Sequence, residues 1–117
     1  MTEQEKTIVL ATELMGWRKW DEKNLEDDKD WSRNSSWLGM NGKHVAYSED
    51  SMGNKAWNPY ENENHGRQVI EKLMEDDELF YAMMNKLERD LGFMAYMKST
   101  LPERMDAVVS VLDSQKA

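Results

Sequence analysis

Two stretches of the sequence place acidic residues at spacings that resemble a calcium-binding loop. Asp28-Lys29-Asp30-Trp31-Ser32 has oxygen ligands at the first, third and fifth positions, and Glu61-x-Glu63-x-His65-Gly66 adds the glycine needed at the sixth. The bidentate glutamate of the twelfth position is missing from both, because Gly39 and Lys72 stand there. We interpret both stretches as coincidences in an acidic chain, and predict no metal ion and no cofactor.

The two histidines are the candidate general bases. His44 and His65 lie far apart in the sequence, and neither belongs to a His-Glu-x-x-His zinc pattern. Serine chemistry would need a histidine base and a third orienting group, and the sequence offers no such trio. We therefore predict no catalytic residues and no enzymatic activity. The alternative is a small enzyme or ligand-binding protein with a pocket near His44 or His65.

Surface charge is the sharpest functional signal. The formal net charge is -8, and acids are dense in Asp21–Asp30 and in Glu75–Glu78. This charge opposes direct binding to nucleic acid or to an anionic membrane, since both require a basic surface. A solvated loop and a helix start would explain the two clusters. The sharper hypothesis is that they occupy a basic groove of a protein partner by mimicking a nucleic acid backbone. The predicted partner-binding residues are Asp27, Asp28, Asp30, Trp31, Glu75, Asp76 and Asp77.

Length and composition predict one folded domain over residues 1–117. The mean hydropathy is low, at -0.87, but five tryptophans and ten methionines supply more apolar bulk than disordered segments usually contain. There are no cysteines, which excludes disulfides and thiol chemistry. Met1–Lys6 is polar, unlike a signal peptide, and no apolar run is long enough to span a membrane. We expect a protein of the cytoplasm.

Helical periodicity and capping signals predict helices at about 3–15, 62–75, 77–91 and 101–114. Thr2-x-x-Glu5 and Thr100-x-x-Glu103 are capping boxes, and Asn62 is a plausible N-cap. Pro102 falls in the first turn of the last helix, where its missing N–H costs nothing. The third helix should likewise begin at an aspartate cap within Glu75–Glu78.

A small antiparallel sheet should accompany these helices, which gives an α+β fold in which the helices pack the sheet. Asn41-Gly42 predicts a hairpin over about 37–47 with a type I′ turn. Strict alternation would then place Val45 and Tyr47 on one face, and His44 and Ala46 on the other. The apolar run at 93–97 could be a buried strand or a helical continuation, and its short length favours a strand. Asn58-Pro59 favours an extended chain that buries Trp57.

Three segments together resemble the phage ABA sandwich domain family. They are "VLATELMGW" (Val9–Trp17), "WNPYENENHGRQVIEKL" (Trp57–Leu73) and "TLPERMDAVVSVL" (Thr100–Leu112). The resemblance implies an origin in a phage or prophage and supplies no catalytic residues. We therefore expect a non-enzymatic accessory protein in the host bacterial cell that acts by protein–protein interaction. The partner would be a host or phage protein, and in the sharper form the protein is an acidic inhibitor of a host nucleic-acid-binding or defence protein. The oligomeric state stays open.

Overall fold

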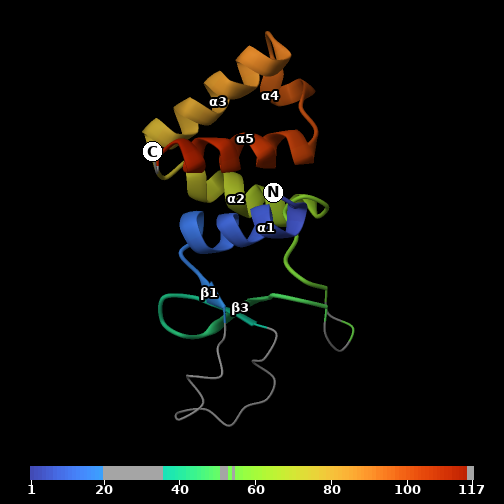
Figure 1. The fold of residues 1–117 in the computed structure, drawn as a ribbon, viewed down its shortest axis with the longest axis vertical. Coiled ribbons are helices and arrows are strands. Elements are labelled where there is room, and N and C mark those ends of the chain that lie inside the picture. Colours follow the sequence, from blue (N-terminus) through green and yellow to red (C-terminus); the bar gives the residue numbers. More distant parts are fainter. Residues whose placement is uncertain (20–35, 51–52, 54, 116–117) are drawn as a thin grey trace. The chain divides into compact units, whose positions relative to one another are not determined.

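The computed structural model describes residues 1–19, 36–50, 53 and 55–115 (Figure 1). The chain divides into two compact units, one formed by Met1–Met15 with Asn58–Ala117 and the other by Gly16–Trp57. We call the first the helical unit and the second the sheet unit. Together they confirm the predicted α+β class, whereas the assignment of residues 1–117 to one domain stays a prediction.

The helical unit is organised around its last helix. Its elements are α1 (Glu3–Val9), the π-helical turn η1 (Leu10–Leu14), α2 (Glu63–Leu73), α3 (Asp77–Leu91), α4 (Ala95–Lys98) and α5 (Leu101–Ser114). α5 contacts α1, η1, α2 and α3, so it occupies the centre of the unit (Figure 1). All four predicted helices are present. No helix in the described part of the chain has the length and apolar character needed to cross a bilayer.

Side-chain caps fix where the helices begin. Thr2 accepts a hydrogen bond from the N–H of Glu5, and Asn62 accepts from Asn64 and His65. Thr100 and Glu103 form a complete capping box at the start of α5. These bonds satisfy backbone donors that have no partner within the helix, which explains why the boundaries were readable from the sequence.

The core of the helical unit is aliphatic. α5 buries residues on several sides, as expected for a central helix, whereas α2 and α3 each bury one stripe at helical spacing. The principal buried apolar side chains are Leu10, Val69, Ile70, Leu73, Leu79, Met83, Leu87, Met105, Val108, Val109, Val111 and Leu112.

The prediction of a strand at 93–97 is wrong, because Phe93 and Met94 form a turn and α4 begins at Ala95. Gly92 and Met94 have φ angles of 85° and 62°, and these left-handed conformations redirect the chain after α3. The N–H of Ser99 then donates to the carbonyl of Ala95 at 2.8 Å. No described strand of the helical unit lies alongside to pair with an extended segment. A helical turn instead pairs its polar backbone groups within the segment itself.

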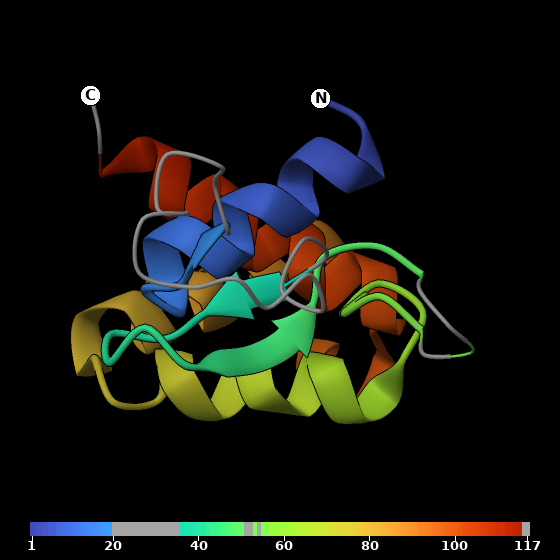
Figure 2. The same ribbon diagram turned by 90° about the horizontal axis from the view of Figure 1, so that it is seen from below.

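The described residues of the sheet unit form three short antiparallel strands, in the order β1 (Arg18–Lys19), β2 (Ser36–Leu38) and β3 (His44–Tyr47) (Figure 2). The predicted hairpin is confirmed, but the predicted type I′ turn is wrong. Gly42 has a φ of 77°, whereas Asn41 does not have a positive φ. The N–H of Gly42 donates to the carbonyl of Gly39, and that of Gly39 to the carbonyl of Lys43, both at 2.9 Å. This pattern is a three-residue loop in which a left-handed glycine follows a type I turn.

A β-bulge overturns the predicted alternation in β3. Leu38 pairs with His44 and Trp37 with Ala46, so Val45 is an extra residue without a partner. The bulge moves His44 to the face of Tyr47, and the two rings meet edge to face with centroids 4.7 Å apart. Alternation assumes an uninterrupted ladder, and the extra residue breaks it.

Trp57 is buried, as predicted, with 3% of its surface exposed. Its ring meets that of Trp17 edge to face, with centroids 4.9 Å apart. Its N–H donates to the carbonyl of Tyr47 at 2.8 Å. The residue therefore ties the end of the sheet unit back to β3.

Candidate functional site

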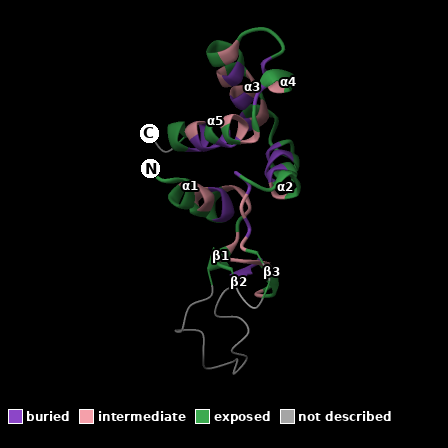
Figure 3. Ribbon diagram, turned by 90° about the vertical axis from the view of Figure 1, so that its right-hand side faces the viewer, coloured by how far each residue is buried: buried purple, intermediate pink, exposed green. Residues whose placement is uncertain are grey.

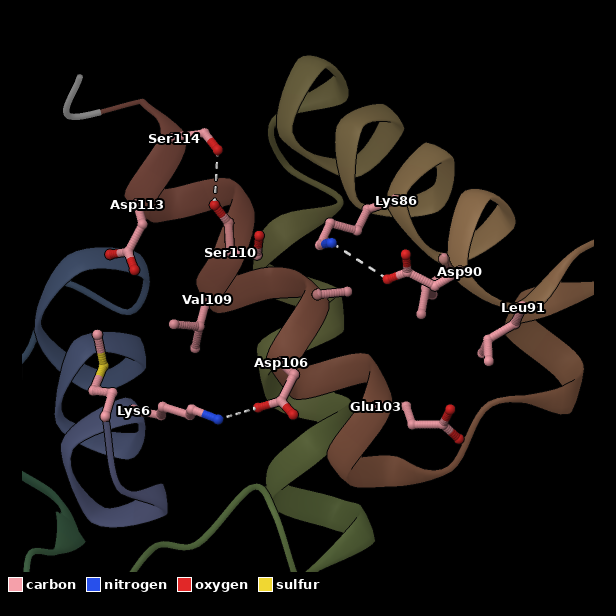
Figure 4. A pocket seen from close by; sticks show the side chains of 13 residues that line it. Lys6, Lys86, Asp90, Leu91, Glu103, Asp106, Val109, Ser110, Asp113 and Ser114 are labelled. Atoms are coloured by element: carbon pink, nitrogen blue, oxygen red, sulfur yellow. Dashed lines mark hydrogen bonds and ion pairs between the residues drawn. The ribbon is translucent and has the colours of Figure 1, made fainter.

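A groove of about 700 Å³ runs along α5 in the helical unit (Figure 4). Its walls come from three segments that are distant in sequence: the start of the chain with α1, the second half of α3, and α5. The charged side chains that line it are Lys6, Lys86, Asp90, Glu103, Asp106 and Asp113. The aliphatic ones are Leu87, Leu91, Ala107 and Val109.

One face of α5 supplies a row of polar side chains to this groove. The row consists of Glu103, Asp106, Ser110 and Asp113. Their spacings of three and four residues keep them on one side of a helix, and the row extends for about 15 Å. The aliphatic side chains beside the row belong to the core, since Leu87, Ala107 and Val109 are only 2%, 3% and 4% exposed. The row therefore gives the groove a predominantly acidic wall.

Asp106 is the most connected side chain of the groove. Its Oδ1 lies 2.8 Å from the Nζ of Lys6 and also accepts a hydrogen bond of 2.8 Å from the phenol of Tyr60. Burial, followed by the hydrogen bond to Asp106 and the negative charge of that carboxylate, raises the pKa of Tyr60 far above its ordinary value. The network joins α1, the Pro59–Tyr60 turn and α5, and thereby holds one wall of the groove in place.

The other charged side chains of the groove differ in their ion-pair and hydrogen-bond partners. The Nζ of Lys86 lies 3.3 Å from Oδ2 of Asp90. Oε1 of Glu103 accepts from the N–H of Thr100 as part of the capping box. The carboxylate of Asp113 has no hydrogen-bond or ion-pair partner within residues 1–19, 36–50, 53 and 55–115. Both lysines are thus neutralised locally, whereas acidic charge remains toward each end of α5.

The predicted partner-binding residues fall into two groups. Asp27, Asp28, Asp30 and Trp31 lie outside the described residues. Glu75, Asp76 and Asp77 are exposed at the start of α3.

The structure gives each of these three acids a local role. Asp76 is the predicted aspartate cap and accepts from the N–H of Leu79 at 3.2 Å. Oε2 of Glu75 lies 3.2 Å from the Nζ of Lys72. Asp77 lies in the first turn, where the helix dipole favours an acid.

His44 forms a pair with a serine that sequence reasoning missed. Its Nδ1 lies 2.7 Å from Oγ of Ser36 on the neighbouring strand. Ser36 is fully buried, so a substrate cannot reach its hydroxyl in this arrangement. The bulge at Val45 brings the two side chains to one face, and no local sequence signal distinguishes that bulge from a regular strand. The pair has the geometry of a structural hydrogen bond.

His65 lies in the first turn of α2. Its Nδ1 accepts a hydrogen bond of 2.9 Å from the N–H of Asn58, so this nitrogen carries no proton in the observed arrangement. Burial lowers the pKa of His65 by disfavouring the charged ring. Glu63 and His65 both lie inside α2 and not in a calcium-type loop. Neither histidine lines the groove.

A smaller hollow of about 480 Å³ lies where α2 approaches the start of α5. It contains Arg67 and Arg104 together with the opposite charge of Glu63. Arg104 donates to Oγ of Ser99 at 2.8 Å and to the carbonyl of Tyr96 at 3.0 Å, and its guanidinium carbon lies over the ring of Tyr96, 4.4 Å from the centroid. These bonds secure the end of α4, so Arg104 has a structural role here.

Three large apolar side chains are exposed in the turn between α3 and α4 and in α4 itself. Figure 3 colours the backbone of this turn as exposed. Phe93 is 81% exposed, Met97 is 74% exposed and Met94 is 46% exposed. We call these three residues the apolar turn. Their sequence favoured a buried strand over a helical continuation, and did not indicate an exposed turn after Gly92.

Comparison with protein-family models, curated proteins and solved structures finds no match to this chain. Among the residues that the structure describes, no group of three or more His, Cys, Asp or Glu side chains is arranged to hold a metal ion.

Proposed function

We propose that this chain is a non-enzymatic accessory protein of a phage or prophage, which acts inside the host cell by binding another protein. The observation that carries the proposal is the apolar turn. Phe93 and Met97 expose most of their surface, although residues of their type are normally buried. Clustered apolar exposure of this kind marks interaction surfaces in soluble proteins.

The backbone of the turn supports this interpretation. Met94 adopts a left-handed conformation, with a φ of 62° and a ψ of 29°, which is uncommon for a side chain of this size. Strained conformations persist where the surrounding structure enforces them, and they concentrate at functional sites. Aromatic residues and methionine are also the residue types enriched in protein interfaces.

The acidic form of the proposal is an inhibitor that occupies a basic surface of a host nucleic-acid-binding or defence protein. Its support is the net charge of -8 and the exposed acids at the start of α3. Because Asp76 caps α3 and Glu75 pairs with Lys72, the acids to test are Asp77 and Glu78.

A small enzyme or ligand-binding protein is the other candidate. Its support is the Ser36–His44 hydrogen bond and the groove along α5. The complete burial of Ser36 weighs against a nucleophile, and the groove residues form ion pairs with one another. A protein-binding function accounts for the exposed side chains of the apolar turn and for the exposed acids at the start of α3, which an enzyme would not require.

The test is capture of partners from a host lysate with tagged wild-type protein and with a Phe93→Asp/Met97→Asp variant. The matched control is Tyr81→Asp, which changes another exposed residue, 71% accessible, about 15 Å from the C-terminal end of α3. Interferometry then measures the affinity for the partner identified. We expect the double variant to lose about tenfold or more in affinity, or about 1.4 kcal/mol, and the control to bind normally. Equal binding by all three proteins would exclude the apolar turn as the contact surface.

A charge-reversal variant tests the acidic mechanism in the same binding measurement. Asp77→Lys/Glu78→Lys should slow association, with an effect that shrinks between about 0.05 M and about 0.5 M salt because the Debye length shortens. Association that is insensitive to both the reversal and the salt would remove the acidic mechanism and leave apolar contact.

A further inference from the structure

We infer that the hollow between α2 and the start of α5 binds the phosphate group of a small organic phosphate. The inference goes beyond the proposed function, because it assigns a ligand site to a surface that none of the three residues of the apolar turn lines. Two observations carry it. One arginine is held in place by the fold with part of its donors unused, and a second arginine in the same hollow has no partner in the described part of the chain.

Arg104 is the cation that the fold holds in place. Its Nε donates to Oγ of Ser99 at 2.8 Å, its Nη2 donates to the carbonyl of Tyr96 at 3.0 Å, and the Tyr96 ring lies against the guanidinium. A guanidinium has five N–H donors, and Arg104 forms no further hydrogen bond with the residues that the structure describes. Three donors are therefore left on a side chain whose orientation is already fixed, which lowers the entropic cost of binding an oxyanion.

Arg67 is the second cation of the hollow. It is exposed, and its side chain forms no ion pair or hydrogen bond within residues 1–19, 36–50, 53 and 55–115. Glu63 precedes it by four residues on α2, a spacing that permits an ion pair, but the two side chains are not paired. Two guanidinium groups and one carboxylate give the hollow an excess of one positive charge, although the net charge of the protein is -8. This local charge attracts an anion.

A phosphate monoester has the charge and the acceptors that two guanidinium groups can use. It carries about two negative charges at neutral pH and presents three strong acceptor oxygens. Hydrogen bonds between a guanidinium and a phosphate are charge-assisted and often bidentate, so one phosphate can accept from both arginines of the hollow. A carboxylate has one charge and two oxygens, which makes it the weaker ligand.

The rest of the hollow favours an organic phosphate over the free ion. Its volume of about 480 Å³ lies in the range of small-molecule sites. Tyr96 and Leu101 line it and are half-buried, so each still presents apolar surface to a ligand. Covering this surface adds to the affinity in proportion to the area removed from water. We therefore expect a phosphate that carries a small aromatic body to bind more tightly than inorganic phosphate.

The experiment titrates the whole chain with phenyl phosphate and follows the backbone amides by NMR. We expect saturable shifts of the amides of Gly66, Arg67, Thr100 and Leu101, which line the hollow. Inorganic phosphate lacks the ring and should bind about fivefold more weakly. Benzoate carries a single charge and should bind about threefold more weakly. Equal affinity for either of these ligands would overturn the assignment to an organic phosphate, as would equal shifts with phenol, which has the ring and no phosphate.

Two variants change the charge of the hollow in opposite directions. Arg67→Gln removes an exposed cation and should weaken phenyl phosphate binding by about fivefold or more. Glu63→Gln removes the opposing carboxylate and should tighten binding by about twofold, a gain that the loss of a structural contact would not produce. The matched control, Arg89→Gln, makes the same change as Arg67→Gln on an exposed residue of α3 outside the hollow. It should alter binding by less than about twofold.

Thermal unfolding of each variant checks that the fold is intact, and Arg104 is left unchanged because it also secures the end of α4. No shift at the four amides, equal losses in Arg67→Gln and Arg89→Gln, or weaker binding by Glu63→Gln would each overturn the inference. These results concern the hollow alone, because partner capture through the apolar turn measures the proposed protein-binding function.

Discussion

The phenol of Tyr60 donates a hydrogen bond of 2.8 Å to Oδ1 of Asp106, 46 residues later in the chain. The same oxygen lies 2.8 Å from the Nζ of Lys6. This carboxylate therefore joins α1, the turn after Pro59 and the centre of α5. It fixes the turn after Pro59 to two helices that are distant from it in the sequence.

Tyr60→Phe should lower the free energy of unfolding by about 1–2 kcal/mol, because it removes a hydrogen bond to a charged acceptor in a partly buried site. Urea denaturation at neutral pH measures the change. Tyr81→Phe removes a hydroxyl from a residue that is 71% exposed, and should have little effect. Equal stability of both variants would show that the Tyr60 hydroxyl contributes nothing net.

Tyr60 should also make stability depend on alkaline pH. Its pKa in the folded protein is raised above the ordinary value of 10.0. Its stabilising contribution is therefore complete below pH 10, and is lost as the pH rises above 10 because the unfolded chain releases the proton more readily. In Tyr60→Phe this decrease should be shallower than in the wild type, as measured by urea unfolding across that range.

His65 should make the free energy of unfolding depend on pH in the acid range. Its pKa is lowered from the ordinary 6.5 by burial, so the neutral ring is favoured in the folded state. The contribution is complete above pH 6.5 and declines as the pH falls below it, since the unfolded chain takes up the proton first. His65→Asn keeps a side-chain acceptor near the N–H of Asn58 and cannot titrate. It should remove this part of the pH dependence; an identical slope in both proteins would exclude His65 as its source.

Gly66→Ala should destabilise the protein, although alanine normally favours a helix by about 1 kcal/mol over glycine. A Cβ at this position would clash with Cδ1 of Leu101 and would lie 3.2 Å from the carbonyl oxygen of Pro59. Leu101→Ala opens the space, so the double variant should be more stable than the sum of the two single changes implies. Simple additivity in urea unfolding would show that Leu101 is not the obstacle.

Trp57→Ala should cost about 3–5 kcal/mol in the free energy of unfolding, because it removes a large side chain that is only 3% exposed. Trp57→Phe keeps an aromatic ring against Trp17 and should cost less. Thermal and urea unfolding measure both. An alanine variant as stable as the wild type would instead assign Trp57 to binding.

Most of the helical architecture was predictable because its determinants are local. The Thr2, Asn62 and Thr100 caps act within one helical turn, and the apolar spacing of α2, α3 and α5 follows directly from helix geometry. The burial of Trp57 also followed from a local signal, the Asn58-Pro59 turn beside it. Asn41-Gly42 located the hairpin, although a single left-handed glycine selected another turn type.

Tertiary structure decided the candidate sites. The groove combines side chains from α1, α3 and α5, and no periodicity within one segment indicates that Lys6 will meet Asp106. An unpaired Val45 brought His44 to Ser36, and two left-handed residues made the 93–97 segment a helical turn with exposed apolar side chains. Periodicity predicts which face of one element is apolar, but it carries no information about which element will cover that face. Which residues pair, and which element covers an apolar face, depend on contacts between segments that are distant in the sequence. Those contacts exist only in the folded chain.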